Sequence, residues 1–165
     1  MKQPKAIPDH YPVIALAGNP NVGKSTLFNS LTTGKKQHTG NWIGKTTANA
    51  WGICHSPARD YTLVDIPGTY SLSSRSAEEE VARDFICFGA HQAVVIVCDA
   101  TCLERNLNLV LQILEATDRT LVCVNLLDEA EKKNITIDLD QLSDLLCVPV
   151  AGTSARKNST LSSFL

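Results

Sequence analysis

Residues 18–25 read Gly-Asn-Pro-Asn-Val-Gly-Lys-Ser, the pattern GxxxxGKS of a phosphate-binding loop. The loop follows the apolar run 13–17 directly, and the helical pattern 25–31 begins at its last residue. Its glycines permit a tight turn in which successive backbone N–H groups point inward, and the positive end of the helix dipole lies at the same place. We expect Lys24 to reach the β- and γ-phosphates of a nucleotide and Ser25 to bind Mg²⁺.

The composition is that of one compact globular domain. The chain has 165 residues, of which 44% are hydrophobic and 19% charged, and its formal net charge of −2 gives no basic excess for binding nucleic acid. Residues 93–98 form the longest apolar stretch, far short of the roughly 20 residues that a membrane span needs. Residues 1–10 read as a flexible leader and 11–165 as the domain. Six cysteines without a CxxC pair indicate free thiols in a reducing cytoplasm.

Apolar runs alternate with amphipathic stretches, which predicts an α/β fold with helices on both faces of a sheet. Ser76 and Glu79 form a capping box for a helix that Gly89 can close. The predicted strands are 13–17, 48–55, 61–65, 94–98, 121–124 and 148–151; the further predicted helices are 103–114, 139–146 and one starting after 158; residues 34–47 are a predicted polar loop.

Three further motifs follow strands in the order typical of a GTPase. Asp65 opens the DxxG pattern 65–68, in which the aspartate orients magnesium through water and the glycine N–H senses the γ-phosphate. Residues 125–128 match NxxD, whose carboxylate accepts hydrogen bonds from guanine N1–H and the 2-amino group, a donor pair that adenine lacks. Residues 153–155 resemble a backbone contact to guanine O6. Because parallel strands present their carboxyl ends at one edge, these motifs are expected to converge there.

The chain resembles the cytoplasmic G domain of the ferrous iron transport protein B (FeoB) family, a TRAFAC-class GTPase family. The resemblance runs from about Val13 to the C-terminus and rests on GNPNVGKS (18–25), GNWIG (40–44), DIPGTYSL (65–72), LERNL (103–107) and NLLDEAEK (125–132). It implies a Ras-like P-loop fold whose mostly parallel six-stranded sheet has one antiparallel edge strand. It also implies GTP hydrolysis with Mg²⁺ and regulation of Fe²⁺ uptake.

The resemblance also assigns roles to single residues. Thr46 matches the switch threonine expected on Mg²⁺, and Asn21 matches the asparagine that helps hold K⁺ in potassium-activated members, with the carbonyls of Gly40 and Trp42 completing that site. A fixed K⁺ would stabilise transition-state charge as an arginine finger does. The expected catalytic residues are Asn21, Lys24, Thr46 and Gly68. The expected GTP-binding residues are Asn21, Val22, Gly23, Lys24, Ser25, Thr26, Gly44, Lys45, Thr46, Asp65, Ile66, Pro67, Gly68, Asn125, Asp128, Thr153, Ser154 and Ala155; Ser25, Thr46 and Asp65 are expected at Mg²⁺.

Some residues depart from the GTPase pattern. Thr69 stands where a Ras-type enzyme has the glutamine that orients the attacking water, so turnover on the order of 10⁻³ to 10⁻² s⁻¹ is expected. Leu126 occupies the position of the usual lysine in the base motif, which favours modest guanine affinity. Ile43 and Lys45 stand in the switch segment where proline and valine are expected. The sequence does not decide whether the segment closes normally with these residues.

Two alternatives to an iron-transport regulator remain. A ribosome-assembly type GTPase would share the GTP site but would need a basic RNA-binding module, and a nucleotide-binding module without hydrolysis would be consistent with Thr69. The family instead implies GTP and GDP as ligands, no nucleic acid, and no direct membrane insertion of this segment. It places the chain at the cytoplasmic face of the inner membrane, as a fragment of a protein that continues into a helical linker domain and a membrane transport domain.

Overall fold

The computed structural model describes residues 11–32, 38–41, 48–73 and 76–154. The strands are β1 (Val13–Gly18), β2 (His38–Asn41), β3 (Ala48–His55), β4 (Asp60–Asp65), β5 (Ala93–Asp99), β6 (Thr120–Asn125) and β7 (Val150–Gly152). The helices are α1 (Lys24–Leu31), α2 (Ala77–Phe88), α3 (Leu103–Ala116), α4 (Leu127–Lys132) and α5 (Leu139–Leu146), with the 3-10 helix η1 (Ala100–Cys102) before α3.

The strands form one sheet in the order β2-β3-β4-β1-β5-β6-β7. Strand β3 runs antiparallel to both of its neighbours, and the pairs from β4 to β7 are parallel. The expected mostly parallel Ras-like sheet is confirmed. It has seven strands where six were expected, because β2 lies within the predicted polar loop and pairs with β3 from His38 opposite Trp51 to Asn41 opposite Ala48.

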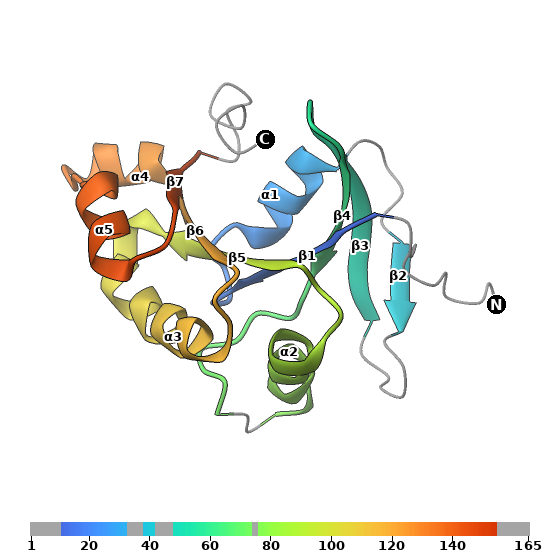
Figure 1. Cartoon of the computed structure of the whole chain (residues 1–165). Helices are drawn as coiled ribbons and strands as arrows, with labels where there is room; N and C mark the ends of the chain where they lie inside the picture. The colour runs from blue at the N-terminus through green and yellow to red at the C-terminus, as the bar shows by residue number, and fades with distance from the viewer. Residues whose placement is uncertain (1–10, 33–37, 42–47, 74–75, 155–165) are drawn as a thin grey trace.

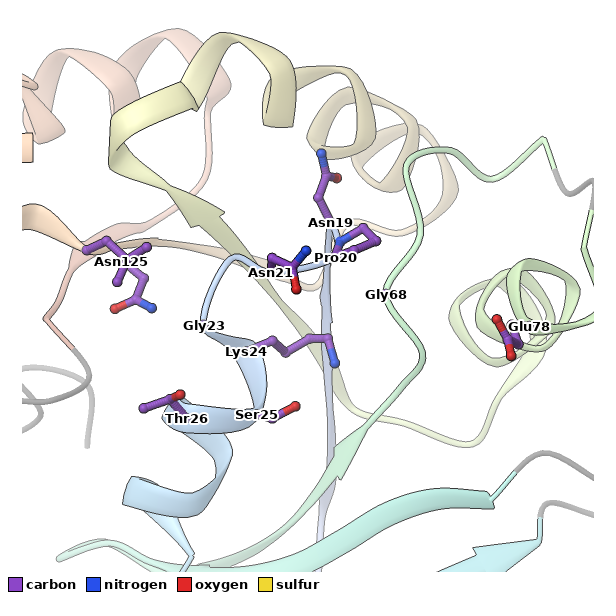
Figure 2. Close-up of a pocket in the computed structure, with 11 residues that line it drawn as sticks. Asn19, Pro20, Asn21, Gly23, Lys24, Ser25, Thr26, Gly68, Glu78 and Asn125 are labelled. Atoms are coloured by element: carbon purple, nitrogen blue, oxygen red, sulfur yellow. The ribbon is translucent and has the colours of Figure 1, made fainter. Parts of the chain in front are cut away.

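The parallel register places the carboxyl ends of the strands at one edge. Gly18 ends β1, Asp65 ends β4 and Asn125 ends β6, so the loop, the DxxG motif and the NxxD motif meet there. Figure 2 shows this edge, with Gly68 and Asn125 on either side of the loop that carries Gly23 and Lys24. The sheet topology therefore brings together motifs that are more than 100 residues apart in the sequence.

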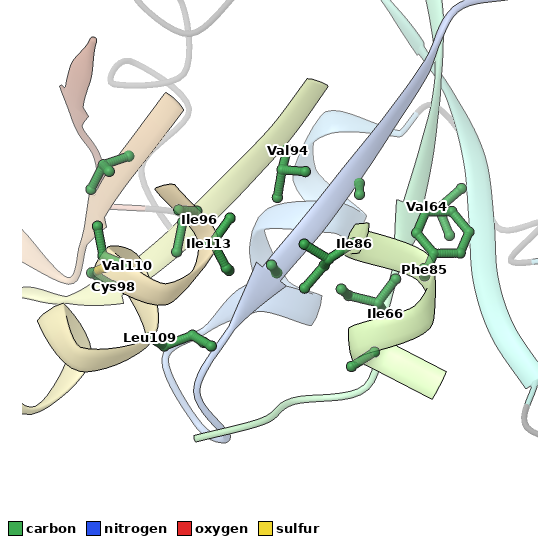
Figure 3. Packing of buried hydrophobic residues seen from close by; sticks show 14 of the residues in the cluster. Val64, Ile66, Phe85, Ile86, Val94, Ile96, Cys98, Leu109, Val110 and Ile113 are labelled. Carbon is green, nitrogen blue, oxygen red and sulfur yellow. The ribbon is translucent and has the colours of Figure 1, made fainter. Parts of the chain in front are cut away.

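Apolar residues on both faces of the central strands explain why the sheet is covered on both sides. Helix α1 lies on one face, and α2 and α3 lie on the other (Figure 1). Leu27 and Phe28 of α1 are buried in the smaller cluster, while Phe85 of α2 and Ile113 of α3 are buried in the larger one (Figure 3). A strand with both faces buried reads as a continuous apolar run, which accounts for the sequence AVVIVCD of β5.

The helix ends follow local capping signals. The Ser76 hydroxyl accepts the backbone N–H of Glu79 at 3.2 Å, which confirms the predicted cap of α2. Gly89 follows the last residue of α2 as expected, and its N–H donates to the Phe85 carbonyl at 2.9 Å. The predicted helix 139–146 coincides with α5, whose cap is Asp138. The predicted helix after residue 158 lies outside the described residues, as does the proposed leader 1–10.

Among the described residues, no helix combines the length and the apolar character that crossing a bilayer requires.

Candidate nucleotide-binding site

A pocket of about 690 Å³ opens at the carboxyl edge of the sheet (Figure 2). Its walls come from the loop after β1, the start of α1, the segments that follow β4 and β6, and the first turn of α2. The lining residues are Asn19, Pro20, Asn21, Gly23, Lys24, Ser25, Thr26, Gly68, Glu78, Asn125 and Leu126. Figure 2 shows Lys24 reaching from the start of α1 across the loop toward the segment that carries Gly68.

The phosphate-binding loop uses two left-handed residues to turn into α1. Asn21 has φ 67° and Gly23 has φ 83°. Asparagine and glycine are the residues that adopt this region at least cost, so the sequence suits the conformation. Gly23 is the N-cap of α1, and its carbonyl accepts the first helical bond, from Leu27 N–H at 2.9 Å. The N-terminus of α1 thus points into the pocket, where it favours an anion.

Replacing Gly23 with alanine is expected to damage this loop. A Cβ at this position would lie 2.4 Å from the Nδ2 atom of Asn125, and the left-handed backbone would add strain. We expect a loss of unfolding free energy of about 2 kcal/mol, together with weaker nucleotide binding. Thermal unfolding and nucleotide titration of the G23A variant measure both effects. A variant with unchanged stability and affinity would contradict this account of the loop.

Lys24 and Ser25 line the pocket, and both contact the carboxylate of Asp65, which is not among the lining residues. The Lys24 ammonium group donates to Asp65 Oδ1, and the Ser25 hydroxyl donates to Asp65 Oδ2 at 2.9 Å. The Lys24 and Asp65 side chains are only 10% and 11% exposed. A cation so little exposed gives a strong field inside the pocket, because solvent screens it poorly. These three residues therefore offer one cation for a phosphate and hard oxygen atoms of the kind that Mg²⁺ prefers.

Asn125 ties the base motif to the phosphate-binding loop. Its side chain is fully buried, and its Nδ2 atom donates to the Val22 carbonyl at 3.0 Å. This hydrogen bond joins residues 103 positions apart. The Asn125 side chain also packs against Gly23. Asn125 was expected to contact the nucleotide. That contact stays a prediction, and the structure shows that the Asn125 side chain holds the end of β6 against the loop.

The remaining parts of the base motif lie together beside this contact. The Asp128 N–H donates to Ser154 Oγ at 3.2 Å, and the Leu127 N–H donates to the Thr153 carbonyl at 3.3 Å. Thr153 N–H donates in turn to the Val124 carbonyl at 2.8 Å. Asp128 lies in the first turn of α4, which begins after the left-handed residue Leu126. The NxxD motif and the segment at 153–154 thus form one hydrogen-bonded unit.

Thr69, the residue after the DxxG motif, does not face the pocket. Its side chain is 1% exposed, and its hydroxyl donates to the Ser71 carbonyl at 2.6 Å. The Thr69 N–H donates to the Gly18 carbonyl at 3.2 Å, which fixes the segment beside the loop. Gly68, one residue earlier, lines the pocket and packs so closely on Pro20 that a Cβ would lie 3.1 Å from the Pro20 backbone.

Two thiols of the central strands are buried and act as packing groups. Cys98 of β5 and Cys123 of β6 are free and fully buried. Desolvation raises the pKa of Cys98 to about 12, helped by the nearby Cys102 and Asp99, and desolvation also raises the pKa of Cys123. Both thiols stay protonated at neutral pH, so neither supplies a nucleophile.

The structure brings seven of the expected site residues into the pocket, and Asp65, Asp128, Thr153 and Ser154 are not among the residues that line it. Those that line the pocket are Asn21, Gly23, Lys24, Ser25, Thr26, Gly68 and Asn125. Val22 and Ile66 are buried in the cores, so any contact that they make to a ligand is through the backbone. Pro67 is half-buried between Ile66 and Gly68. Gly40 lies in the edge strand β2, paired with Asn49, and does not line the described pocket. Trp42, Ile43, Gly44, Lys45, Thr46 and Ala155 lie outside the described residues.

Four pocket residues were not expected from the sequence: Asn19, Pro20, Glu78 and Leu126. Asn19 and Pro20 lie inside the phosphate-loop motif at positions that the pattern leaves open, and Leu126 lies at an open position of NxxD. Glu78 belongs to the first turn of α2, and only tertiary packing brings it across the pocket from Lys24 (Figure 2). No local sequence signal identifies Glu78.

Comparisons with known proteins identify the family of the chain. A family model described as "Ferrous iron transport protein B" matches residues 12–165. The Fe(2+) transporter FeoB of Escherichia coli (strain K12) is 48% identical over 141 residues, which is 83% of this chain and 18% of that protein. The chain therefore spans about 18% of the length of the curated relatives it matches.

Solved structures give the same result. The G domain of the T. maritima FeoB iron transporter is 39% identical, with a TM-score of 0.85 and 94% of each chain covered. The cytosolic domain of that transporter in its GDP form is 39% identical, with a TM-score of 0.89, and the match covers 96% of this chain and 62% of that one. The chain belongs to the ferrous iron transport protein B family and has the fold of its GTPase G domain.

Proposed function

We propose that the chain is the GTP-binding and slowly GTP-hydrolysing regulatory domain of a ferrous iron transporter. The observation that carries the proposal is the Asn125–Val22 hydrogen bond, because it joins the base motif and the phosphate-binding loop around one pocket. Relatives named Fe(2+) transporter FeoB, and a related cytosolic domain solved in a GDP form, support the choice of nucleotide and of pathway.

Residues of the loop bind and orient the phosphates. Lys24 exchanges its contact with Asp65 for the β- and γ-phosphates, and the N–H groups at the start of α1 donate to the same anion. Ser25 would bind Mg²⁺ directly and Asp65 through a water molecule, since both residues present the hard oxygen atoms that this ion prefers and lie in contact with each other. Bound there, the ion neutralises charge that develops on the phosphates. Thr46 is proposed as a further ligand from the switch segment.

Asp128 selects the base in this proposal. A carboxylate accepts the two N–H groups of guanine and finds no matching donors on adenine. The Ser154–Asp128 hydrogen bond holds the backbone of this residue, so the carboxylate is presented from a fixed position. Thr153, Ser154 and Ala155 supply the contact to guanine O6.

Hydrolysis is slow because the residue after the DxxG motif cannot orient water. The Thr69 hydroxyl is bonded to the Ser71 backbone, away from the pocket. We propose that K⁺ beside Asn21 compensates in part, with the carbonyls of Gly40 and Trp42 as its other ligands. The left-handed Asn21 lines the pocket at the phosphate-binding loop, and its amide oxygen is a suitable donor for this cation.

Hydrolysis is therefore expected to be faster in KCl than in NaCl. Single-turnover GTP hydrolysis should rise about tenfold in KCl, and the N21A variant should lose the difference between the salts while still binding GDP. N29A is the matched control, since Asn29 lies on α1 outside the pocket. Equal rates in both salts would contradict the potassium site, and no hydrolysis above background in either would contradict the enzymatic assignment.

The wider arrangement of the protein is part of the same proposal. Residues 11–165 form the G domain after a leader at 1–10, and a helical linker domain and a membrane transport domain belong to the full-length protein. The chain then lies at the cytoplasmic face of the inner membrane, without inserting into it and without binding nucleic acid. The gene sequence beyond the codon for Leu165 tests this, because a gene without a polytopic segment would contradict it.

A further inference from the structure

The side chain of Gln112, on helix α3, bonds to the segment that follows the DxxG motif. Gln112 Oε1 accepts the backbone N–H of Leu72 at 2.7 Å and the hydroxyl of Ser71 at 3.1 Å. Gln112 is half-buried, and its amide nitrogen donates to Asn108 Oδ1 at 3.4 Å. These two hydrogen bonds from the segment to α3 therefore end on the same acceptor atom of Gln112.

The segment is tightly bonded within itself. The Thr69 hydroxyl donates to the Ser71 carbonyl at 2.6 Å and accepts the Ser71 N–H at 3.2 Å. The Ser73 N–H donates to Ser71 Oγ at 2.9 Å. Because Thr69 directly follows Gly68, this turn connects the contact of Ser71 with α3 to Gly68. The Thr69 N–H bond to the Gly18 carbonyl holds the other end of the turn beside the phosphate-binding loop.

Helix α3 is a firm support for this contact. Asn106 is buried and bridges the end of β5 to η1, since Oδ1 accepts the Asp99 N–H at 3.2 Å and Nδ2 donates to the Cys102 carbonyl at 2.9 Å. A second contact joins α3 to the segment 69–73, because the Arg105 guanidinium lies 4.8 Å from the Tyr70 ring centroid. Arg105 and Gln112 share one face of α3, since positions i and i+7 coincide on a helix.

We propose that Gln112 is a positioning residue for the γ-phosphate, acting through residues 69–73 on Gly68. This inference rests on the proposed function, in which the Gly68 N–H senses that phosphate. Gly68 lines the pocket and is packed against Pro20 of the phosphate-binding loop. With the segment fixed to α3, the Gly68 N–H is ordered before a nucleotide binds, and a triphosphate does not bear the entropic cost of ordering it. A diphosphate makes no such contact.

The chemistry of the contact allows a sharp test. Both donors point to the oxygen of Gln112, so Gln112→Glu keeps the acceptor while Gln112→Met removes it with little change in side-chain size. Asn108→Ala is the control for the contact of the amide nitrogen, since Asn108 is exposed on the same helix. Leu111→Ala is the control for substitution on α3, because the Leu111 side chain is 54% exposed.

Calorimetry with the 165-residue chain tests the proposal. It measures the affinities for the non-hydrolysable analogue GMPPNP and for GDP. We expect Q112M to weaken GMPPNP binding about tenfold, as for two lost hydrogen bonds, and to leave GDP binding nearly unchanged. Q112E, N108A and L111A should keep the wild-type ratio of the two affinities. Thermal unfolding of each variant shows that it is folded.

Equal weakening of both nucleotides by Q112M would show a purely structural role and overturn the proposal. An unchanged or tighter GMPPNP affinity would overturn it as well, and so would a Q112E variant that behaves like Q112M. A wild-type chain that binds neither nucleotide would instead contradict the proposed function, and this inference with it. The wild-type titration therefore separates the two failures.

Discussion

Replacing Lys24 with methionine is expected to weaken the binding of GTP and GDP by about 100-fold, as for the loss of two charge-assisted hydrogen bonds to phosphate. The Lys24 side chain is the cation at the floor of the pocket, and it contacts the carboxylate of Asp65. The substitution also removes the cation that pairs with Asp65, a side chain that is little exposed. The unpaired negative charge of Asp65 then repels a phosphate. Calorimetric titration with each nucleotide measures the effect.

A double variant separates the two consequences of that substitution. Lys24→Met alone is expected to lower stability, because a largely buried carboxylate loses its ion pair. Adding Asp65→Asn removes that charge, so unfolding free energy should recover while nucleotide affinity stays low. Lys133→Met is the control for loss of a lysine, since Lys133 lies exposed at the end of α4. A Lys24→Met chain with wild-type affinity would contradict the phosphate-binding role of this residue.

Replacing Asp128 with asparagine is expected to change the preferred base. The carboxylate that accepts two N–H groups of guanine becomes an amide, so GTP affinity should fall by about 100-fold. Xanthine carries a carbonyl in place of the 2-amino group, and the new amide N–H can donate to it, so affinity for xanthosine triphosphate should rise. The contact from the Asp128 backbone N–H to Ser154 Oγ is unaffected by the change. Competition between the two nucleotides for the variant measures the switch.

The neighbouring residue provides the control for this second variant. Glu129 lies in the same first turn of α4, and its carboxylate accepts from Lys132 Nζ at 2.9 Å. Glu129→Gln removes one negative charge from the same helix end, so it reproduces any general electrostatic effect. It should leave the preference for guanine intact. GTP affinity that is unchanged in Asp128→Asn would show that the base-selecting residue has been misassigned.

Residues with local signals were predictable from the sequence. The run 93–98 has the continuous apolar character of a buried parallel strand, and Ser76 with Glu79 marks the start of α2. The order of the motifs was enough to predict that they meet at one edge of the sheet. The α/β sheet with helices on both faces and the pocket around Lys24 were therefore foreseeable from spacing and sheet topology, and the family resemblance supplied the Ras-like arrangement.

Features that depend on tertiary contacts were not predictable. Strand β2 has four residues inside a polar stretch, and its pairing with β3 defines it. Helix α4 has six residues and begins after the left-handed Leu126, so it reads as a turn. The contacts of Asn125 with Val22 and of Gln112 with Leu72 join residues 103 and 40 positions apart, and an amide in a sequence does not reveal its partner.

Titration of the wild-type chain with GTP analogue and ATP analogue in the presence of Mg²⁺ tests the central claim most directly. The guanine nucleotide should bind with one-to-one stoichiometry, and the adenine nucleotide should bind about 100-fold more weakly, because it offers no donor pair to Asp128. Equal affinities for the two, or no binding of the guanine nucleotide, would contradict the assignment of this pocket as a GTP site.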